Sequence, residues 1–132
     1  MIVTPLYAGL LALWFLVLSV RVARNRGKRQ VSLGDGGDTM LQRMIRAQGN
    51  FAEYVPMVLV LLVILELSHF STYVLHGLGI ALVLGRLLHG YALGFSKQFM
   101  FGRVFGTVLT FATLLTAGLL CIYQGVLGLQ LQ

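Results

Sequence analysis

Four apolar segments, each about as long as a lipid bilayer is thick, constrain the fold of this chain more than any other feature. A spanning helix needs about 20 apolar residues, so four such helices account for much of a chain of 132 residues. The segments fall at about residues 3–24, 39–67, 73–94 and 102–126. The composition agrees, since 11% of residues are charged, compared with about 25% in a soluble domain. We therefore expect an all-α, membrane-spanning four-helix bundle that forms one domain over residues 1–132.

Basic residues are distributed unevenly between the ends of this expected bundle. The first apolar segment is followed by Arg21, Arg24, Arg26, Lys28 and Arg29, and Lys97 lies between the third and fourth segments. The connection after the second segment and both chain ends contain no Lys or Arg. Because cytoplasmic loops are enriched in Lys and Arg, we expect both basic loops in the cytoplasm and both termini outside. The net charge of +6 then reflects membrane topology, and we expect no nucleic-acid partner.

The first segment and the cysteine content exclude further classes of protein. Residues 1–20 lack the positively charged start and the small-residue cleavage site of a secretory signal, so we expect a retained helix. Cys121 is the single cysteine of the chain. No Cys/His cluster has metal-ligand spacing, so we expect no metal site and no structural disulfide.

A polar stripe on the second apolar segment is the first candidate for a binding site. Four side chains fall within about 80° of one helix face at 100° per residue: Arg43, Arg46, Asn50 and Glu53. Asn50 and Glu53 lie in or near apolar sequence, where an ionisable group costs several kcal/mol and is a functional candidate. Either these groups bind a ligand, or they satisfy one another as structural contacts between helices. Glu66 lies on another face of the segment, and we expect it to be solvated.

A second polar pair, Arg86 and His89, lies one helical turn apart in the third apolar segment. A buried guanidinium needs a partner, and either Glu53 or an anionic ligand is a candidate for that role. The expected topology also brings four arginines toward one membrane face: Arg26, Arg46, Arg86 and Arg103. Arginine forks bind carboxylates through two hydrogen bonds, so this set favours a small anionic ligand. The separation of Arg46 and Glu53 along a helix, about 10 Å, is close to the reach of an extended tripeptide.

Two motifs in these segments resemble the membrane-associated proteins in eicosanoid and glutathione metabolism, a family abbreviated MAPEG. The second helix of that family carries Arg-x-x-x-Asn-x-x-Glu, and this chain has Arg46-Ala47-Gln48-Gly49-Asn50-Phe51-Ala52-Glu53-Tyr54. The third helix of the family carries Gly/Ala-Arg-x-x-His/Tyr, and this chain has Gly85-Arg86-Leu87-Leu88-His89. The four helices, the motif spacing and the basic first loop also agree. The resemblance therefore covers essentially the whole chain, and it points to the small bacterial branch of the family.

The resemblance implies a homotrimer in a bacterial inner membrane, with glutathione bound between neighbouring subunits toward the cytoplasmic face. Matching positions imply a set of glutathione-binding residues: Arg46, Gln48, Asn50, Glu53, Tyr54, Arg86 and His89. Members of the family also hold the glutathione thiolate with arginines near the end of the first helix and the start of the fourth. Arg26 and Arg103 are the nearest matches, although Arg103 aligns only after a shift of one residue. The chain departs from the eicosanoid enzymes at Gln42 and Leu93, so an eicosanoid substrate is not implied.

These observations predict a membrane enzyme, a glutathione transferase or peroxidase, that uses glutathione as co-substrate. Its second substrate is a lipophilic electrophile or hydroperoxide that arrives from the surrounding membrane lipids. A thiol with a pKa of about 8.5 is only a few per cent ionised at neutral pH, and two arginines at a water-poor site would lower that pKa. Two alternatives remain open: a binding or scaffold protein without turnover, and a small proton-coupled transporter. Small multidrug transporters place their essential Glu in the first helix, where this chain has no acidic residue.

Overall fold

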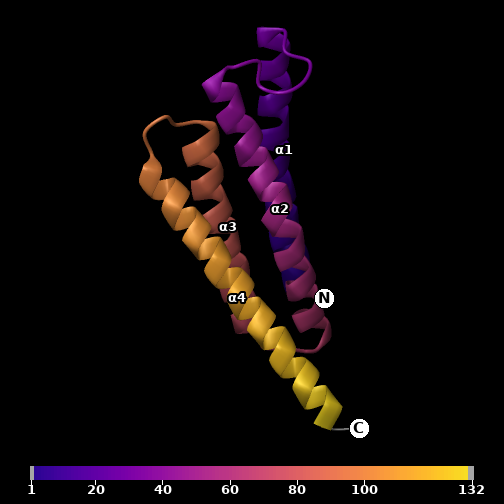
Figure 1. The fold of residues 1–132 in the computed structure, drawn as a ribbon. Coiled ribbons are helices and arrows are strands. Elements are labelled where there is room, and N and C mark those ends of the chain that lie inside the picture. The colour runs from indigo at the N-terminus through magenta and orange to yellow at the C-terminus, as the bar shows by residue number, and fades with distance from the viewer. Residues whose placement is uncertain (1, 131–132) are drawn as a thin grey trace.

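The structure, a computed structural model, describes residues 2–130, which form a bundle of four helices (Figure 1). Helices α1 (Val3–Arg29) and α2 (Thr39–Leu67) form one hairpin, and α3 (Thr72–Gly94) and α4 (Met100–Gln130) form the other. All four helices are long and apolar enough to cross a membrane. The predicted all-α, membrane-spanning four-helix architecture is confirmed.

The helix boundaries agree with the sequence prediction at α2 and differ most at α1 and α4. Helix α1 was expected to end near Arg24 but continues to Arg29. Lys and Arg are good helix formers, and cations in the last turn interact favourably with the helix dipole, so the basic residues extend α1. The helix ends where Gln30 adopts a left-handed conformation with φ of 55°. Helix α4 begins at Met100 and ends at Gln130, beyond the expected range of 102–126 at both ends.

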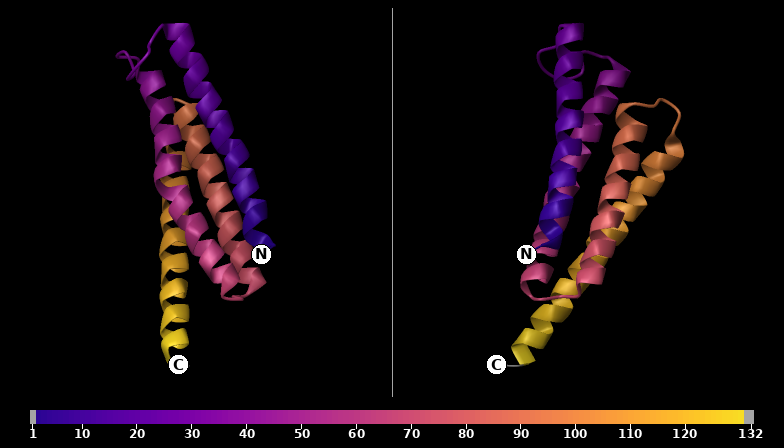
Figure 2. Two further views of the ribbon diagram at one scale, coloured as in Figure 1. Left: turned by 90° about the vertical axis from the view of Figure 1, so that its right-hand side faces the viewer. Right: turned by 180° about the vertical axis from the view of Figure 1, so that it is seen from behind.

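The two hairpins lie side by side, with both hairpin loops at one end of the bundle and both termini at the other (Figures 1 and 2). Helix α3 packs against each of the other three helices, whereas α1 and α4 make no contact with one another in the part of the chain described. The last turns of α4 project beyond the bundle (Figure 1), and no described residue of α4 after Ala117 is buried. A single chain therefore leaves the flanks of α1 and α4 open.

One apolar face of α2 forms the centre of the core. Its buried residues recur at intervals of three or four: Leu41, Met44, Ala47, Phe51, Val55, Val58, Leu62 and Leu65. Residues at this spacing share one side of a helix, so α2 presents a continuous apolar surface to its neighbours. The outer surface is also apolar, with exposed side chains such as Leu6 and Leu13 on α1 and Val108 and Leu115 on α4. Such a surface suits contact with lipid or with further membrane helices.

Small residues allow α4 to pack closely on α3. The buried face of α4 consists of Gly102, Gly106, Thr110, Thr113 and Ala117. The hydroxyl groups of Thr110 and Thr113 each donate a hydrogen bond of 2.8 Å to the backbone carbonyl four residues earlier. These hydroxyls are therefore satisfied within their own helix, and the surface that α4 presents to α3 consists of small side chains that allow close packing.

Glu66 joins the end of α2 to the start of α1. Its carboxylate accepts hydrogen bonds from the backbone N–H groups of Ile2, Val3 and Thr4, the last two at 2.8 Å. The first N–H groups of a helix have no partner within the helix, and the positive end of the helix dipole favours a carboxylate there. The expectation that Glu66 is solvated is therefore wrong, because the carboxylate caps a helix that is distant in sequence.

Candidate functional site

A polar cavity of about 330 Å³ lies between α2, α3 and α4, toward the end of the bundle that carries the hairpin loops. Seven residues line it: Gln42, Arg43, Arg46 and Asn50 from α2, His89 and Leu93 from α3, and Arg103 from α4. Four of them were predicted as site residues from the sequence: Arg46, Asn50, His89 and Arg103. None of the described residues in the lining is acidic, so the cavity carries three arginines without an internal counter-ion.

Arg86 lies behind this cavity and is almost completely buried, with 2% of its surface exposed. Its Nη1 donates a hydrogen bond of 2.8 Å to Oδ1 of Asn50, and its Nη2 donates one of 3.4 Å to the carbonyl of Gly106. Its Nε has no partner among residues 2–130. Glu53 pairs elsewhere, so the hypothesis that Glu53 neutralises Arg86 is wrong. Arg86 instead fixes the amide of Asn50 at the edge of the cavity and adds a buried positive charge behind it.

Arg46 and Glu53 form an ion pair along the outside of α2. Nη1 of Arg46 lies 3.2 Å from Oε1 of Glu53, and Nη2 lies 3.4 Å from Oε2. The two side chains are 56% and 52% exposed. An exposed pair of this kind contributes little to stability, typically about 0–1 kcal/mol. A ligand can therefore take over either partner at small cost to the fold.

Arg43 has a structural role within the polar stripe. Its Nη2 donates hydrogen bonds to the carbonyls of Ala92, at 3.0 Å, and Ser96, at 2.8 Å. These acceptors lie at the last turn of α3 and just after it, where backbone carbonyls lack partners within the helix. The stripe thus divides: Arg43 ties α2 to the end of α3, whereas Arg46 and Asn50 face the cavity.

The close approach of α4 to α3 places Arg103 beside His89. A Cβ atom added at Gly106 would lie 2.5 Å from the carbonyl oxygen of Gly85 and 2.8 Å from the backbone nitrogen of His89. No side chain fits at that position without a shift of one helix. The glycine therefore brings the first turns of α4, including Arg103, against the cavity that α2 and α3 form.

Three residues that the family resemblance implied lie outside the cavity in the single chain. Gln48 faces α1, where its Nε2 donates a hydrogen bond of 3.0 Å to Oγ of Ser19. The Tyr54 ring packs against the Phe111 ring, with centroids 5.3 Å apart. Arg26 lies at the first loop, where its Nη1 donates a hydrogen bond of 2.6 Å to the carbonyl of Gly34. Glu53 also lies outside the lining but stays linked to the cavity through Arg46.

Besides Arg43, which belongs to the polar stripe, two cavity residues were not predicted as site residues: Gln42 and Leu93. In the sequence they stand out as departures from the eicosanoid enzymes. Their spacing was the available signal, because Gln42 lies one helical turn before Arg46 and Leu93 lies one turn after His89. Residues four apart share a helix face, so this spacing could have placed both beside the predicted residues.

Comparison with known proteins assigns this chain to a family. Residues 4–123 match the sequence profile of the MAPEG family. The chain belongs to the MAPEG family. It is 40% identical over 113 residues to the inner membrane protein YecN of Escherichia coli strain K12, an alignment that covers 86% of this chain and 85% of the relative. The YecN protein of Escherichia coli O6:H1 strain CFT073 matches equally well.

The two MAPEG motifs meet in the structure. The first motif lies on α2 and the second on α3, and the hydrogen bond from Arg86 to Asn50 joins them directly. His89, one turn after Arg86, lies in the cavity lining and is 5% exposed. The motifs that indicated MAPEG membership in the sequence therefore form one connected polar unit in the fold.

Proposed function

We propose that this MAPEG protein binds glutathione in the polar cavity and uses it as co-substrate, as a transferase or peroxidase acting on lipophilic electrophiles or hydroperoxides. The cavity lining is the observation that supports the proposal most directly, with its three arginines, two amides and an imidazole. Glutathione is a tripeptide with two carboxylates, and arginine binds carboxylates through paired hydrogen bonds. The cavity volume of about 330 Å³ also falls in the usual range for small-molecule sites.

In this proposal, the positive charge around the cavity activates the thiol of glutathione. Arg46 and Asn50 hold the peptide, while Arg103, or Arg26 of a neighbouring subunit, stabilises the ionised sulfur. Lowering the thiol pKa by two units takes about 2.7 kcal/mol of differential stabilisation and makes most of the thiol nucleophilic at neutral pH. The sulfur then forms a bond to the electrophilic carbon of the second substrate as the leaving group departs. Cys121 is not needed for this reaction, and its Sγ lies 3.6 Å from the carbonyl of Leu61, far along the bundle from the cavity.

We further propose a homotrimer in which a neighbouring subunit completes each site. The single chain leaves Arg26 apart from the cavity and leaves the Arg46–Glu53 pair exposed. The flanks of α1 and α4 are apolar and open. These features suit an interface through which a neighbour reaches the cavity, the arrangement that MAPEG membership suggests.

We propose that the protein lies in the inner membrane with its loop end in the cytoplasm and both termini outside. The relatives are named as inner membrane proteins, and the loop end holds all of the Lys and Arg residues near the helix ends. Labelling of a cysteine introduced at Gly36, in a Cys121→Ser background, tests this orientation in sealed vesicles. Access only from the cytoplasmic side is expected, and access only from the outside would refute it.

Isothermal titration of glutathione into the wild-type protein in nanodiscs tests the proposed function. Arg46→Ala is expected to weaken binding by about 2–5 kcal/mol, as when one partner of a desolvated charged contact is removed. Lys97→Ala, which removes an exposed charge outside the cavity, is the matched control and should bind like the wild type. Failure of the wild-type protein to bind millimolar glutathione would refute the proposal. Binding without turnover of any model electrophile would instead favour the binding or scaffold protein.

The transporter hypothesis has no support in this structure. MAPEG membership accounts for the embedded polar residues, and Glu53 pairs with Arg46. A carboxylate occupied by an arginine does not suit the uptake of a cationic compound.

A further inference from the structure

A second groove, separate from the polar cavity, runs along α1 beside the end of α3. It is the larger of the two, with a volume of about 560 Å³. Its inner half is apolar and is formed by Leu16, Val17 and Val20 of α1 and by the ring of Phe95. The three aliphatic side chains are 57%, 45% and 45% exposed, so this surface is open on the single chain.

The outer half of the groove is basic and is formed by Arg21, Arg24 and Lys28. At 100° per residue these three positions fall within about 60° of one face of α1, over two helical turns or about 10 Å. The side chains of Arg24 and Lys28 are exposed. The basic half of the groove therefore presents three positive charges in a short row.

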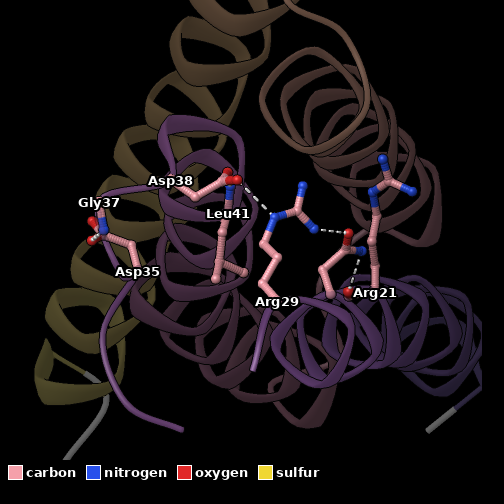
Figure 3. Close-up of polar contacts among 7 residues, drawn as sticks. Arg21, Arg29, Asp35, Gly37, Asp38 and Leu41 are labelled. Carbon is pink, nitrogen blue, oxygen red and sulfur yellow. Dashed lines mark hydrogen bonds and ion pairs between the residues drawn. The ribbon is translucent and has the colours of Figure 1, made fainter. Parts of the chain in front are cut away.

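Arg21 is held in place at the junction of the two halves. Its Nε donates a hydrogen bond of 2.8 Å to the carbonyl of Gly94, and its guanidinium carbon lies 4.0 Å from the centroid of the Phe95 ring. In the described chain its two terminal nitrogens make no further hydrogen bond. Figure 3 shows the Arg21 guanidinium apart from the Arg29–Asp38 pair. The charge is thus positioned in advance, with donors left for a ligand.

The Phe95 side of the groove is also rigid. The Phe95 ring stacks on Trp14, with centroids 5.9 Å apart, and on Tyr91, with centroids 5.8 Å apart. Trp14 is itself fixed by a hydrogen bond of 3.0 Å from its Nε1 to the carbonyl of Arg86. A ligand in this groove meets a preformed surface, and such a surface lowers the entropic cost of binding.

No carboxylate of the chain neutralises the three cations. The chain has four acidic residues, and each has a partner elsewhere in the structure. Asp38 pairs with Arg29 at 2.7 Å (Figure 3), and this hydrogen bond holds the pKa of Asp38 below its usual range. Glu53 pairs with Arg46, Glu66 caps α1, and Asp35 accepts a hydrogen bond from the N–H of Gly37. The counter-ion of the groove must therefore come from outside the described chain.

We propose that this groove binds an anionic phospholipid, with the phosphate on Arg21, Arg24 and Lys28 and an acyl chain along Leu16, Val17 and Val20. The order of the groove along α1 matches that of a lipid in one leaflet, since the apolar residues lie deeper in the span and the cations lie at its end. Basic pockets at the ends of membrane helices bind anionic headgroups in this way. A free phosphate would leave the apolar half unused, so the lipid is the occupant that both halves fit.

Native mass spectrometry of the full chain, released from micelles with equal amounts of phosphatidylglycerol and phosphatidylcholine, tests the proposal. The wild-type protein should retain phosphatidylglycerol preferentially. Lys28→Gln should reduce that preference about fivefold, the effect expected for one cation near an anionic headgroup. Lys97→Gln is the matched control, because it removes the same exposed charge from the other loop at the same end of the bundle. The control should keep the wild-type preference.

Two further measurements complete the test. Lys28→Arg should restore the preference, and the melting temperature of Lys28→Gln without added lipid should equal that of the wild type, because the Lys28 side chain is exposed. Glycerol phosphate, which has the headgroup chemistry but no acyl chain, should not displace the lipid at equal concentration. The proposal is wrong if the wild type shows no preference, if Lys97→Gln loses it as much as Lys28→Gln, or if glycerol phosphate competes as well as the lipid.

Discussion

At the scale of single residues, three arginines close to one another have different roles because their partners differ. Arg86 is buried and bonds an amide and a carbonyl, Arg43 bonds two carbonyls at the end of α3, and Arg46 bonds an exposed carboxylate. No carboxylate neutralises the charge of the buried arginine, and the low dielectric around it strengthens its attraction for an anion. Arg86 and Arg43 therefore shape the cavity and raise its potential, while Arg46 stays accessible to a ligand.

Arg103 is the residue whose substitution should separate chemistry from binding. Arg103→Ala is expected to raise the pKa of the bound thiol and, at about pH 6, to leave glutathione affinity within about twofold, because a contact made mainly with ionised sulfur adds little to binding of the neutral thiol. Thiolate absorbance in the ultraviolet, followed against pH, measures the shift, and titration calorimetry measures the affinity. Arg46→Ala is the converse variant, in which the affinity for glutathione should be lost first. An affinity loss in Arg103→Ala as large as that in Arg46→Ala would assign Arg103 to a carboxylate of the peptide instead.

The sequence predicted which of these residues share a helix face but not what they bond. The helical periodicity placed Arg46 near Asn50 and Arg86 near His89, and the cavity brings Arg46, Asn50 and His89 together. The partner of Arg86 was not predictable, because one acceptor is the backbone carbonyl of Gly106 on another helix. Backbone acceptors exist at every position and leave no signal in the side-chain pattern. Charge complementarity therefore suggested Glu53 or an anionic ligand as the partner of Arg86, whereas the packing of α4 supplies the carbonyl of Gly106.

At the scale of helices, boundaries were predictable where the sequence contains a specific stop or start. An Asp immediately before the second apolar segment is a start signal, and Asp38 does cap α2 through a hydrogen bond of 2.7 Å to the N–H of Leu41. Helix α1 has no comparable end signal, because the hydrophobic pattern stops before the helix does. The extra turn and a half of α1 carries Arg26, Lys28 and Arg29, so the boundary error falls on Arg26 and Lys28, two residues for which we propose binding roles.

The contact between α3 and α4 depends on Gly106 and should fail when a methyl group is added there. Gly106→Ala places a Cβ against the Gly85 carbonyl and the backbone of His89, and overpacking of this kind costs about 1–3 kcal/mol. Thermal unfolding in detergent should show a lower midpoint, and glutathione binding should weaken because Arg103 moves with α4. Gly118→Ala, on the same helix with no atom within 4 Å of the added Cβ, should unfold at or slightly above the wild-type midpoint. Equal midpoints for the two variants would mean that the helices adjust without cost.

At the scale of the whole molecule, the single chain has its two proposed binding sites at the loop end and its open flanks along the span. The polar cavity is lined by residues of α2, α3 and α4, and the basic groove is lined by α1 and Phe95. Trp14, which stacks on Phe95, donates a hydrogen bond to the backbone carbonyl of Arg86. The exposed apolar residues on α1 and α4 leave room for lipid on one side and for other subunits on another. Arg26, the one proposed site residue near the first loop, lies outside the cavity of its own chain. In the proposed trimer it therefore serves the cavity of a neighbouring subunit.

Mixing of two inactive variants tests whether neighbouring subunits share a site. In the proposed cyclic trimer, each interface joins the Arg46 of one subunit to the Arg26 of the next. Arg46→Ala and Arg26→Ala trimers each lack one group at every interface, whereas random mixing at equal ratio gives both groups at about one quarter of interfaces. Purification through both tags keeps only the mixed trimers, in each of which one interface of the three has both groups, so these trimers should recover about one third of the wild-type thiolate absorbance at neutral pH. Mixing Arg46→Ala with Arg103→Ala is the control and should recover nothing, because Arg46 and Arg103 line the cavity of one chain. No recovery in the first mixture despite mixed trimers would place each site within one subunit. Recovery in the control would instead mean that Arg46 and Arg103 of one site come from different subunits.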